Sequence, residues 1–449
     1  MAGIGRRNSV RMLRRLRRRA WQFTTGGRWT AQLPPSIRQN LRRFWFDGVF
    51  ASSSDSIAVT YLSLFVLALG ATRAQIGLMS ALASLSAALL LLPGAILVER
   101  RGRRKRIVVL SGGGVSRLAL LLLALVPLFF AGPTAVYAAI ALVILRSAFG
   151  NLGVPAWVSL TADIVPLSWR GRYFSSRNMA MGVANMLTTF LVGQLITLVG
   201  GTNGYQLAMG LAFAVGMAST YSFARLEEPL VLAPPEAKDS GSQLPLLQHL
   251  RAHPDFLFFC ATAAIWNLSI NIAGPFFNPY LVESLKASAG VVGALSVVAT
   301  LAALPGQRLF GSLVDRWGMR QVQLVTGLLI PLMPWAWALA RSPWHVVPVN
   351  LAAGFLWAGY ELANFNFLLI LTPEDRRPRY TALYQIVVMV ALAGGAALGG
   401  IVAQRWGYTP VFVLSGIGRL CAALLFARFV HQPASPSTAK RWLPSGSKK

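Results

Sequence analysis

Five charged residues stand inside long apolar stretches of this sequence, and their chemistry needs an explanation. They are Asp55, Arg117, Arg146, Glu361 and Arg419. A charge at such depth costs roughly 2.5–3.5 kcal/mol on insertion scales, so these residues pair with one another or face a polar cavity. Carboxylates in this setting can carry protons, and arginines can bind a carboxylate or an anionic ligand bidentately. The sequence therefore indicates a polar site inside an apolar body.

Asp55 is the first candidate for proton chemistry. It lies about eleven residues into the apolar segment that begins at residue 44, which is roughly 16 Å along a helix. Four serines, Ser52, Ser53, Ser54 and Ser56, surround it and make a lipid-facing position unsuitable. Burial favours the neutral form of a carboxylate. Reversible protonation of Asp55 is one interpretation, and a fixed ion pair between Asp55 and an arginine is the other.

The other charged positions suggest a ligand surface. Arg146 could stabilise a nearby carboxylate or bind an anionic substrate. Trp357, Glu361 and Asn364 share one helix face, which suits a cationic or amphipathic ligand but equally suits ordinary packing. For Arg117 and Arg419 the sequence names no partner.

The elements that must position these residues are membrane-spanning helices. The chain of 449 residues is 55% hydrophobic and only 12% charged, which excludes a soluble enzyme. Its apolar runs are too continuous for the alternating pattern of a barrel, and lipid otherwise tolerates only helices. Breaks at turn clusters predict twelve spans: 44–69, 76–98, 107–130, 134–163, 178–199, 205–224, 256–283, 287–314, 321–340, 345–371, 380–403 and 408–429.

The net charge of +28 is explained by topology rather than by nucleic-acid binding. With the amino terminus inside, 34 of the 42 Lys and Arg residues lie in tails and cytoplasmic loops. Four, Arg73, Lys286, Arg341 and Arg405, lie on the outer side, and the remaining four lie within helices. This bias follows the positive-inside rule and places both termini in the cytoplasm of a cell-membrane protein. The first 43 residues, with twelve Arg and no acid, should contact anionic lipid.

Metal, disulfide and enzyme chemistry find no support. Cys260 and Cys421 fall in apolar runs and are interpreted as packing residues. The four histidines are scattered and form no HExxH pattern, and no helix carries paired catalytic carboxylates. We expect no cofactor, no metal and no enzymatic activity.

The chain contains an internal repeat. AILVERRGRR at residues 95–104 and GSLVDRWGMR at residues 311–320 follow the second and eighth spans at an offset of 216 residues. A second pair of basic loops follows the fourth and tenth spans, at Pro166 and Pro373. Two matched loops in the same order indicate a duplicated six-helix unit, which is typical of secondary transporters.

These loops resemble the signature of the major facilitator superfamily, roughly G-x-L-a-D-R-x-G-R-R, which recurs in both halves of its members. The second copy matches well, whereas the first has Ala95 in place of Gly and Glu99 in place of Asp. The resemblance covers residues 44–430 and implies an all-α membrane protein of twelve transmembrane helices in two six-helix bundles. It says almost nothing about the substrate.

The resemblance also assigns roles to loop residues. It implies that Glu99 faces the start of the eleventh helix and that Arg103 pairs with Asp163 at the inner end of the fourth. The alternative is that these arginines only enforce topology, and both can hold. Gly102 and Gly318 suit a tight connection. The gating set is Glu99, Arg100, Gly102, Arg103, Asp163, Gly311, Asp315, Arg316, Gly318 and Arg320.

In the superfamily the first, fourth, seventh and tenth helices line a central cavity. Asn271, which lies 216 residues after Asp55, would join the site with Asp55, Arg146, Trp357, Glu361 and Asn364. The segment around Arg146 is similar to L-x-x-x-R-x-x-Q-G of many proton-driven antiporters, with Phe149 replacing Gln. The efflux pattern G-P-x-x-G-G is absent from the fifth helix, which weakens a prediction of drug export.

The resulting prediction is a transporter of a small molecule that works by alternating access and is coupled to protons. The alternatives are a facilitator, a lipid or amphiphile transporter, and a receptor or assembly factor of the same fold. We expect a monomer, with a cytoplasmic tail at 1–43, bundles at 44–226 and 255–430, a cytoplasmic linker at 227–254 and a tail at 431–449.

Overall fold

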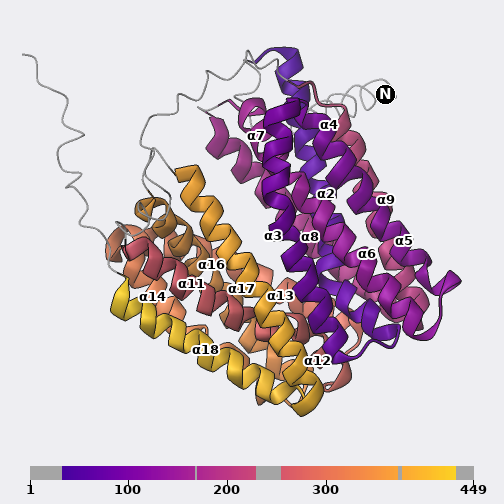
Figure 1. Cartoon of the computed structure of the whole chain (residues 1–449), viewed down its shortest axis with the longest axis vertical. Helices are drawn as coiled ribbons and strands as arrows, with labels where there is room; N and C mark the ends of the chain where they lie inside the picture. Colours follow the sequence, from indigo (N-terminus) through magenta and orange to yellow (C-terminus); the bar gives the residue numbers. More distant parts are fainter. Residues whose placement is uncertain (1–32, 167–168, 229–253, 373–376, 431–449) are drawn as a thin grey trace, which may run out of the picture.

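Helices form every regular element in the residues that the computed structural model describes, which are 33–166, 169–228, 254–372 and 377–430. The side chains of Glu99, Arg101 and residues 377–379 are not described. The predicted tails and linker therefore lie largely outside the described residues. Figure 1 shows the amino-terminal half in indigo to magenta beside the carboxy-terminal half in orange to yellow.

The amino-terminal half contains the six predicted passes, several of which are built from more than one helical segment. Its elements are α2 (Pro35–Ala68), α3 (Arg73–Arg101), α4 (Arg104–Val108), the π-helix η2 (Val109–Val115), α5 (Ser116–Phe129), α6 (Gly132–Leu152), α7 (Val154–Ile164), α8 (Arg170–Val199) and α9 (Gly201–Ala224).

The carboxy-terminal half contains the other six passes. Its elements are α11 (Pro254–Ala273), the 3-10 helix η4 (Gly274–Phe276), α12 (Phe277–Glu283), α13 (Ala289–Trp317), α14 (Met319–Leu329), α15 (Leu332–Ala338), α16 (Pro343–Leu371), α17 (Arg377–Trp406) and α18 (Tyr408–Phe429).

Three spans differ clearly from the prediction. The fifth begins at Arg170 rather than at residue 178, because its polar, basic start is helical ahead of the apolar part. The first helix begins at Pro35 rather than at residue 44. Proline is favoured at the first helical position, and the helix starts ahead of the apolar segment from which the span was predicted. The ninth span is split into α14 and α15, because Pro331 has no N–H to continue the helix. Eleven helical stretches in the described ranges are long and apolar enough to cross a membrane, and this split span is not one of them.

Large apolar side chains cover the outside of the protein. Leu198, Leu339 and Phe129 are 84%, 79% and 76% exposed. A soluble monomer rarely leaves so much apolar surface uncovered. Lipid is the surrounding in which this surface is stable.

The two halves are joined at one end of the molecule. We call this the far end: α2 ends there at Ala68, α3 begins at Arg73 and α12 ends at Glu283. The opposite end, where the chain leaves α9 and enters α11, is the linker end. Helices α3 and α17 cross closely, as do α8 and α13 (Figure 1).

Glycines make the crossing of α3 and α17 possible. A Cβ atom on Gly77 would lie 2.5 Å from the Cα atom of Gly400, so neither position has room for a side chain. Such small residues let helix backbones approach each other in lipid. The contact between the halves therefore depends on this pair of glycines.

Candidate functional site

Two arginines from different helices hold one carboxylate. Asp55 Oδ1 accepts hydrogen bonds from Arg117 Nη1 at 2.7 Å and from Arg146 Nη2 at 2.8 Å. Arg117 Nη2 also approaches Oδ2 at 3.4 Å, so Arg117 binds as a fork and Arg146 through a single contact. The Asp55 side chain is 48% exposed, against 10% for Arg117 and 19% for Arg146. The carboxylate is thus fixed in place but open to solvent.

Helix α9 provides the surface against which Arg117 lies. Ser54 Oγ donates to the carbonyl oxygen of Ala212 at 2.6 Å and accepts from Arg117 Nη1 at 2.9 Å. A Cβ atom on Gly216 would lie 2.6 Å from Arg117 Cδ and 2.9 Å from Ser54 Oγ. The missing side chain at Gly216 therefore makes room for the ion pair.

We expect Gly216→Ala to lower the melting temperature of the purified protein, although Gly→Ala inside a helix normally stabilises by about 0.5–1 kcal/mol. Moving Arg117 away from the new methyl group should cost about 1–3 kcal/mol. Gly210→Ala is the matched control, because it lies in the same helix and meets nothing within 4 Å. A melting temperature for Gly216→Ala equal to that of Gly210→Ala would contradict the described contact.

A π-helical segment opens a cavity beside this ion cluster. Residues Val109–Val115 include three consecutive glycines at 112–114, and such π segments are frequent at functional sites. Thr220 Oγ1 donates to the carbonyl oxygen of Gly113 at 3.0 Å, which ties the segment to α9. The cavity has a volume of about 260 Å³. Its lining is Asp47, Asp55, Val108, Val109, Gly112, Gly113, Ser116, Arg117, Arg146, Ser147, Gly150, Asn151, Ser219, Thr220 and Phe223.

A second carboxylate, Asp47, lines the same cavity two turns closer to the linker end. It accepts a hydrogen bond from Ser219 Oγ at 2.7 Å and lies 3.6 Å from Arg177 Nη2. The Arg177 guanidinium packs 4.3 Å from the ring of Phe44 and donates to its carbonyl oxygen. Asp47 and Arg177 are both buried, with side-chain exposures of 7% and 5%. This pair is satisfied within the protein.

The structure brings only some of the predicted site residues together. Asp55 and Arg146 are in contact, whereas Asn271 donates to the carbonyl oxygen of Leu392 in α17 and so joins two helices of the other half. Among the described residues, no hydrogen bond, ion pair or ring contact links the predicted residues of the carboxy-terminal half to Asp55.

Trp357 and Asn364 belong to a packed cluster of the carboxy-terminal half. The Trp357 ring lies 6.1 Å from Trp266 and 5.6 Å from Tyr360. Asn364 accepts from Gln323 and donates to Tyr384. The pocket beside them measures only about 20 Å³, room for roughly one water. In this conformation these residues pack, and Glu361 is exposed, without an ion pair to any described residue.

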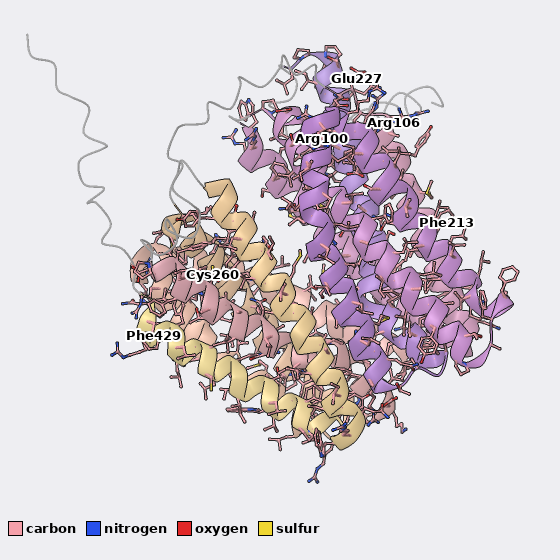
Figure 2. The ribbon with its side chains drawn as sticks, in the orientation of Figure 1. Arg100, Arg106, Phe213, Glu227, Cys260 and Phe429 are labelled. Carbon is pink, nitrogen blue, oxygen red and sulfur yellow. The ribbon has the colours of Figure 1, made fainter. Side chains whose placement is uncertain are left out.

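The predicted partner of Asp163 is wrong by one residue. Arg104, not Arg103, pairs with Asp163, and it also contacts Ser159 and Glu228. The reason is local geometry: Gly102 ends α3 with φ of 61°, and Arg103 is the exposed residue that precedes α4. Arg104 is the first residue of α4 and lies against α7. Figure 2 shows Arg100, Arg106 and Glu227 gathered at this linker end.

The matching loop of the carboxy-terminal half uses its last arginine to cap a helix. Arg320 donates to the carbonyl oxygens of Ala427 and Val430 at the end of α18, where carbonyls lack helical partners and a cation is favoured. Asp315 and Arg316 are exposed. Gly318 has φ of 84°, as its place in a tight connection predicts, and Gly311 meets nothing within 4 Å of an added Cβ. The side chain of Glu99 is not among those described, so its contact with the start of the eleventh helix stays a prediction.

An ion cluster at the far end is absent from the sequence-based prediction. Arg73 of α3 pairs with Glu283 of α12 at 2.9 Å and lies 4.3 Å over the ring of Tyr408. Tyr408 donates to the same oxygen of Glu283 at 2.7 Å. The cluster thus joins the two halves. Its one sequence signal was that Arg73 is among the few basic residues on that side.

The structure also shows the surroundings of Arg117 and Arg419, for which the sequence named no partner. Arg117 is the second partner of Asp55. Arg419 is buried, with 3% exposure, and has no ion pair to any residue in the described ranges.

The cavity also had a signal in the sequence. The three glycines at 112–114 were that signal, because a glycine run inside a span is unusual.

Comparison with known proteins agrees with this architecture. The family model of the Major Facilitator Superfamily matches residues 44–272 and 264–446. A relative named multi-drug resistance efflux pump PmrA homolog, from Lactococcus lactis, is 25% identical over 181 residues, 39% of this chain and 44% of the relative. PmrA of Streptococcus pneumoniae is 24% identical over 182 residues, 39% and 45% of the two chains. These matches span less than half of each relative.

Solved structures match nearly the whole fold. The nucleoside transporter NupG superposes with a TM-score of 0.69 at 11% identity, covering 87% of this chain and 100% of that one. An inward-facing, occupied bacterial homolog of the human lysosomal transporter Spinster gives 0.67 at 15% identity, covering 88% and 98%. A D-xylose-proton symporter gives 0.67 at 14% identity, covering 87% and 97%. Identities this low establish the fold alone.

Proposed function

The chain belongs to the Major Facilitator Superfamily of transporters and is not an enzyme, and from this premise we propose that it is a proton-coupled secondary active transporter of a small solute. The two helical halves would rock about a central site and expose it to each side of the cell membrane in turn. Asp55 would carry the proton.

The contact of Asp55 with two arginines carries this proposal. A carboxylate inside an apolar helix is a proton-relay candidate by its position, and this one is 48% exposed, so water can reach it. It is held by guanidinium groups from α5 and α6, so a change in its charge alters contacts among three helices. That coupling between protonation and helix contacts is what a proton-driven cycle requires.

The contacts between the halves support an inward-facing state. The basic residues concentrate at the linker end, which by the positive-inside rule belongs in the cytoplasm together with both termini. The described hydrogen bonds and ion pairs between the halves lie toward the far end, including Arg73 to Glu283, Asn278 to Thr60 and Gly290 to Thr197. We assign the far end to the outside. The loops at 95–104 and 311–320 would then close the cytoplasmic side in the opposite state.

The remaining expectations belong to the same proposal. The basic cytoplasmic face would contact anionic lipid, and the protein would act as a monomer. Drug efflux is the activity in the name of the PmrA relatives, but the efflux pattern G-P-x-x-G-G is missing from α8 of this chain. We propose no direction of transport.

The test has two steps. A ligand screen by thermal shift identifies a binder, since a ligand that binds the native state raises the apparent stability. The binder is then offered to proteoliposomes under a pH gradient. We expect accumulation that collapses when a protonophore dissipates the gradient. Flux indifferent to the protonophore would indicate a facilitator, and binding without flux would indicate a receptor.

A further inference from the structure

Arg146 is poorly satisfied for a guanidinium inside a membrane protein. It has five N–H donors, yet its only described hydrogen bond is the contact of Nη2 with Asp55. Its Nε atom is buried and has no partner among the described residues. The same carboxylate is bound more fully by Arg117, through two contacts and with support from Ser54. Arg146 is therefore the arginine with donors to spare.

The charges around the cavity do not balance. Asp47 pairs with Arg177, and Asp55 is shared by Arg117 and Arg146, so three guanidinium groups face two carboxylates. A guanidinium does not lose its proton in a protein. One positive charge is thus in excess on guanidinium groups that are only 10% and 19% exposed, where an unpaired charge is expensive.

We propose that this cavity binds a small organic anion, whose oxyanion group is held bidentately by Arg146. This inference rests on the proposed transport function and names its substrate class. The planar fork of arginine matches the two oxygens of a carboxylate, phosphate or sulfonate group. The anion neutralises the excess positive charge of the cluster, and Asp55 keeps its ion pair with Arg117.

The cavity suits such a ligand in size and lining. Its volume of about 260 Å³ is just below the range typical of small-molecule sites, roughly 300–1,000 Å³. Ser116 of α5 and the second amide N–H of Asn151 of α6 add donors beside the arginines, whereas the Ser147 hydroxyl already donates to the carbonyl oxygen of Ala83. A cationic ligand would add to the excess charge instead of relieving it.

Anion binding also provides a link to the proton. With the cavity empty, Asp55 is the one negative charge between Arg117 and Arg146. With a monoanion bound and a proton taken by Asp55 from water, the anion is the one negative charge. Before the proton is taken up, the bound anion cancels the excess positive charge, and protonation of Asp55 then restores the local charge of the empty cavity. Arrival of the anion and uptake of one proton are therefore electrostatically matched.

Binding of simple probes to the full-length protein in detergent tests this inference without any transport. The probes are acetate, benzoate, succinate and inorganic phosphate, with benzylammonium and benzyl alcohol as the cationic and neutral counterparts of benzoate, all at constant ionic strength. We expect at least one anion to raise the melting temperature by ~2 °C or more. Benzylammonium and benzyl alcohol should have no such effect.

Three variants make the result specific. Arg146→Gln should lose the anion-dependent shift, and it should fold because Asp55 and Arg117 still form a one-to-one pair. Asp55→Asn should increase the shift, because it removes the carboxylate that competes for Arg146. Arg405→Gln removes the same charge from an exposed position and should keep the shift.

The inference is overturned if no anion shifts the wild type more than Arg146→Gln, or if benzylammonium stabilises the wild type and Asp55→Asn abolishes that effect. A cation that is bound and transported in this way would contradict the proposed anion site and leave the proposed transport function intact. Anion binding without flux in proteoliposomes would do the reverse.

Discussion

Asp55→Asn is expected to abolish accumulation driven by a pH gradient. One coupled proton allows about tenfold accumulation for each unit of pH difference, and asparagine cannot take up that proton. The variant should therefore reach no more than the equilibrated level inside proteoliposomes. Exchange of labelled for unlabelled substrate needs no net proton movement and should still be measurable.

The variant should fold well enough for this measurement. Breaking a fully buried ion pair costs about 3–5 kcal/mol, and Arg117 and Arg146 are only 10% and 19% exposed. The asparagine amide oxygen can still accept their hydrogen bonds, so we expect a loss below that range. Asp55→Glu is the matched control, because it keeps a carboxylate and should keep gradient-driven accumulation. Accumulation by Asp55→Asn at the wild-type level would show that the proton is carried elsewhere.

Gly400→Leu should prevent closure of the far end. Helices α3 and α17 cross where Gly77 and Gly400 almost touch, and a Cβ on Gly400 would lie 3.0 Å from the Cα atom of Gly77. A leucine has no space there while the halves are in contact. The conformation with this end closed is lost, so we expect transport to fall ~10-fold or more, equivalent to a penalty above about 1.4 kcal/mol.

Thiol labelling reports the same change directly. Cys260 and Cys421, the free cysteines of the described residues, are first replaced by serine. A single cysteine at Ala403→Cys, a fully buried position whose carbonyl oxygen lies by Arg73, then marks the far end, and Gly400→Leu should speed its reaction with an impermeant maleimide. Gly394→Leu is the control, since Gly394 lies in the same helix, is exposed and meets only Leu268 Cδ1 at 3.9 Å. Equal labelling rates in both variants would mean that the glycine crossing does not control closure.

The helical architecture was predictable because lipid is a demanding solvent. A segment that crosses it must form its own backbone hydrogen bonds and present apolar side chains to lipid. The spans can therefore be recognised as long apolar runs in the sequence. Duplication then added the repeated loops at 95–104 and 311–320, and the superfamily followed from them. Proline and glycine breaks were harder to place, because the ninth span is apolar on both sides of Pro331.

The site was predictable only in part. Asp55 and Arg146 were identifiable because charges are rare in apolar helices. The role of Arg117 was not, since it depends on how α5 rotates against α2 and on the space left by Gly216. The exchange of Arg103 for Arg104 as the partner of Asp163 has the same origin, because one residue of helical register turns a side chain by about 100°.

The sequence by itself thus determined which residues cannot face lipid, because transfer of charge out of water is costly, and it predicts on which side of the membrane the basic loops belong. Only the tertiary structure decided which of those residues meet. Pairing depends on helix rotation, on close approach at glycines and on the π segment that opens the cavity, and these arise from packing between segments far apart in the chain. The excess positive charge beside Asp55 is a property of that packing.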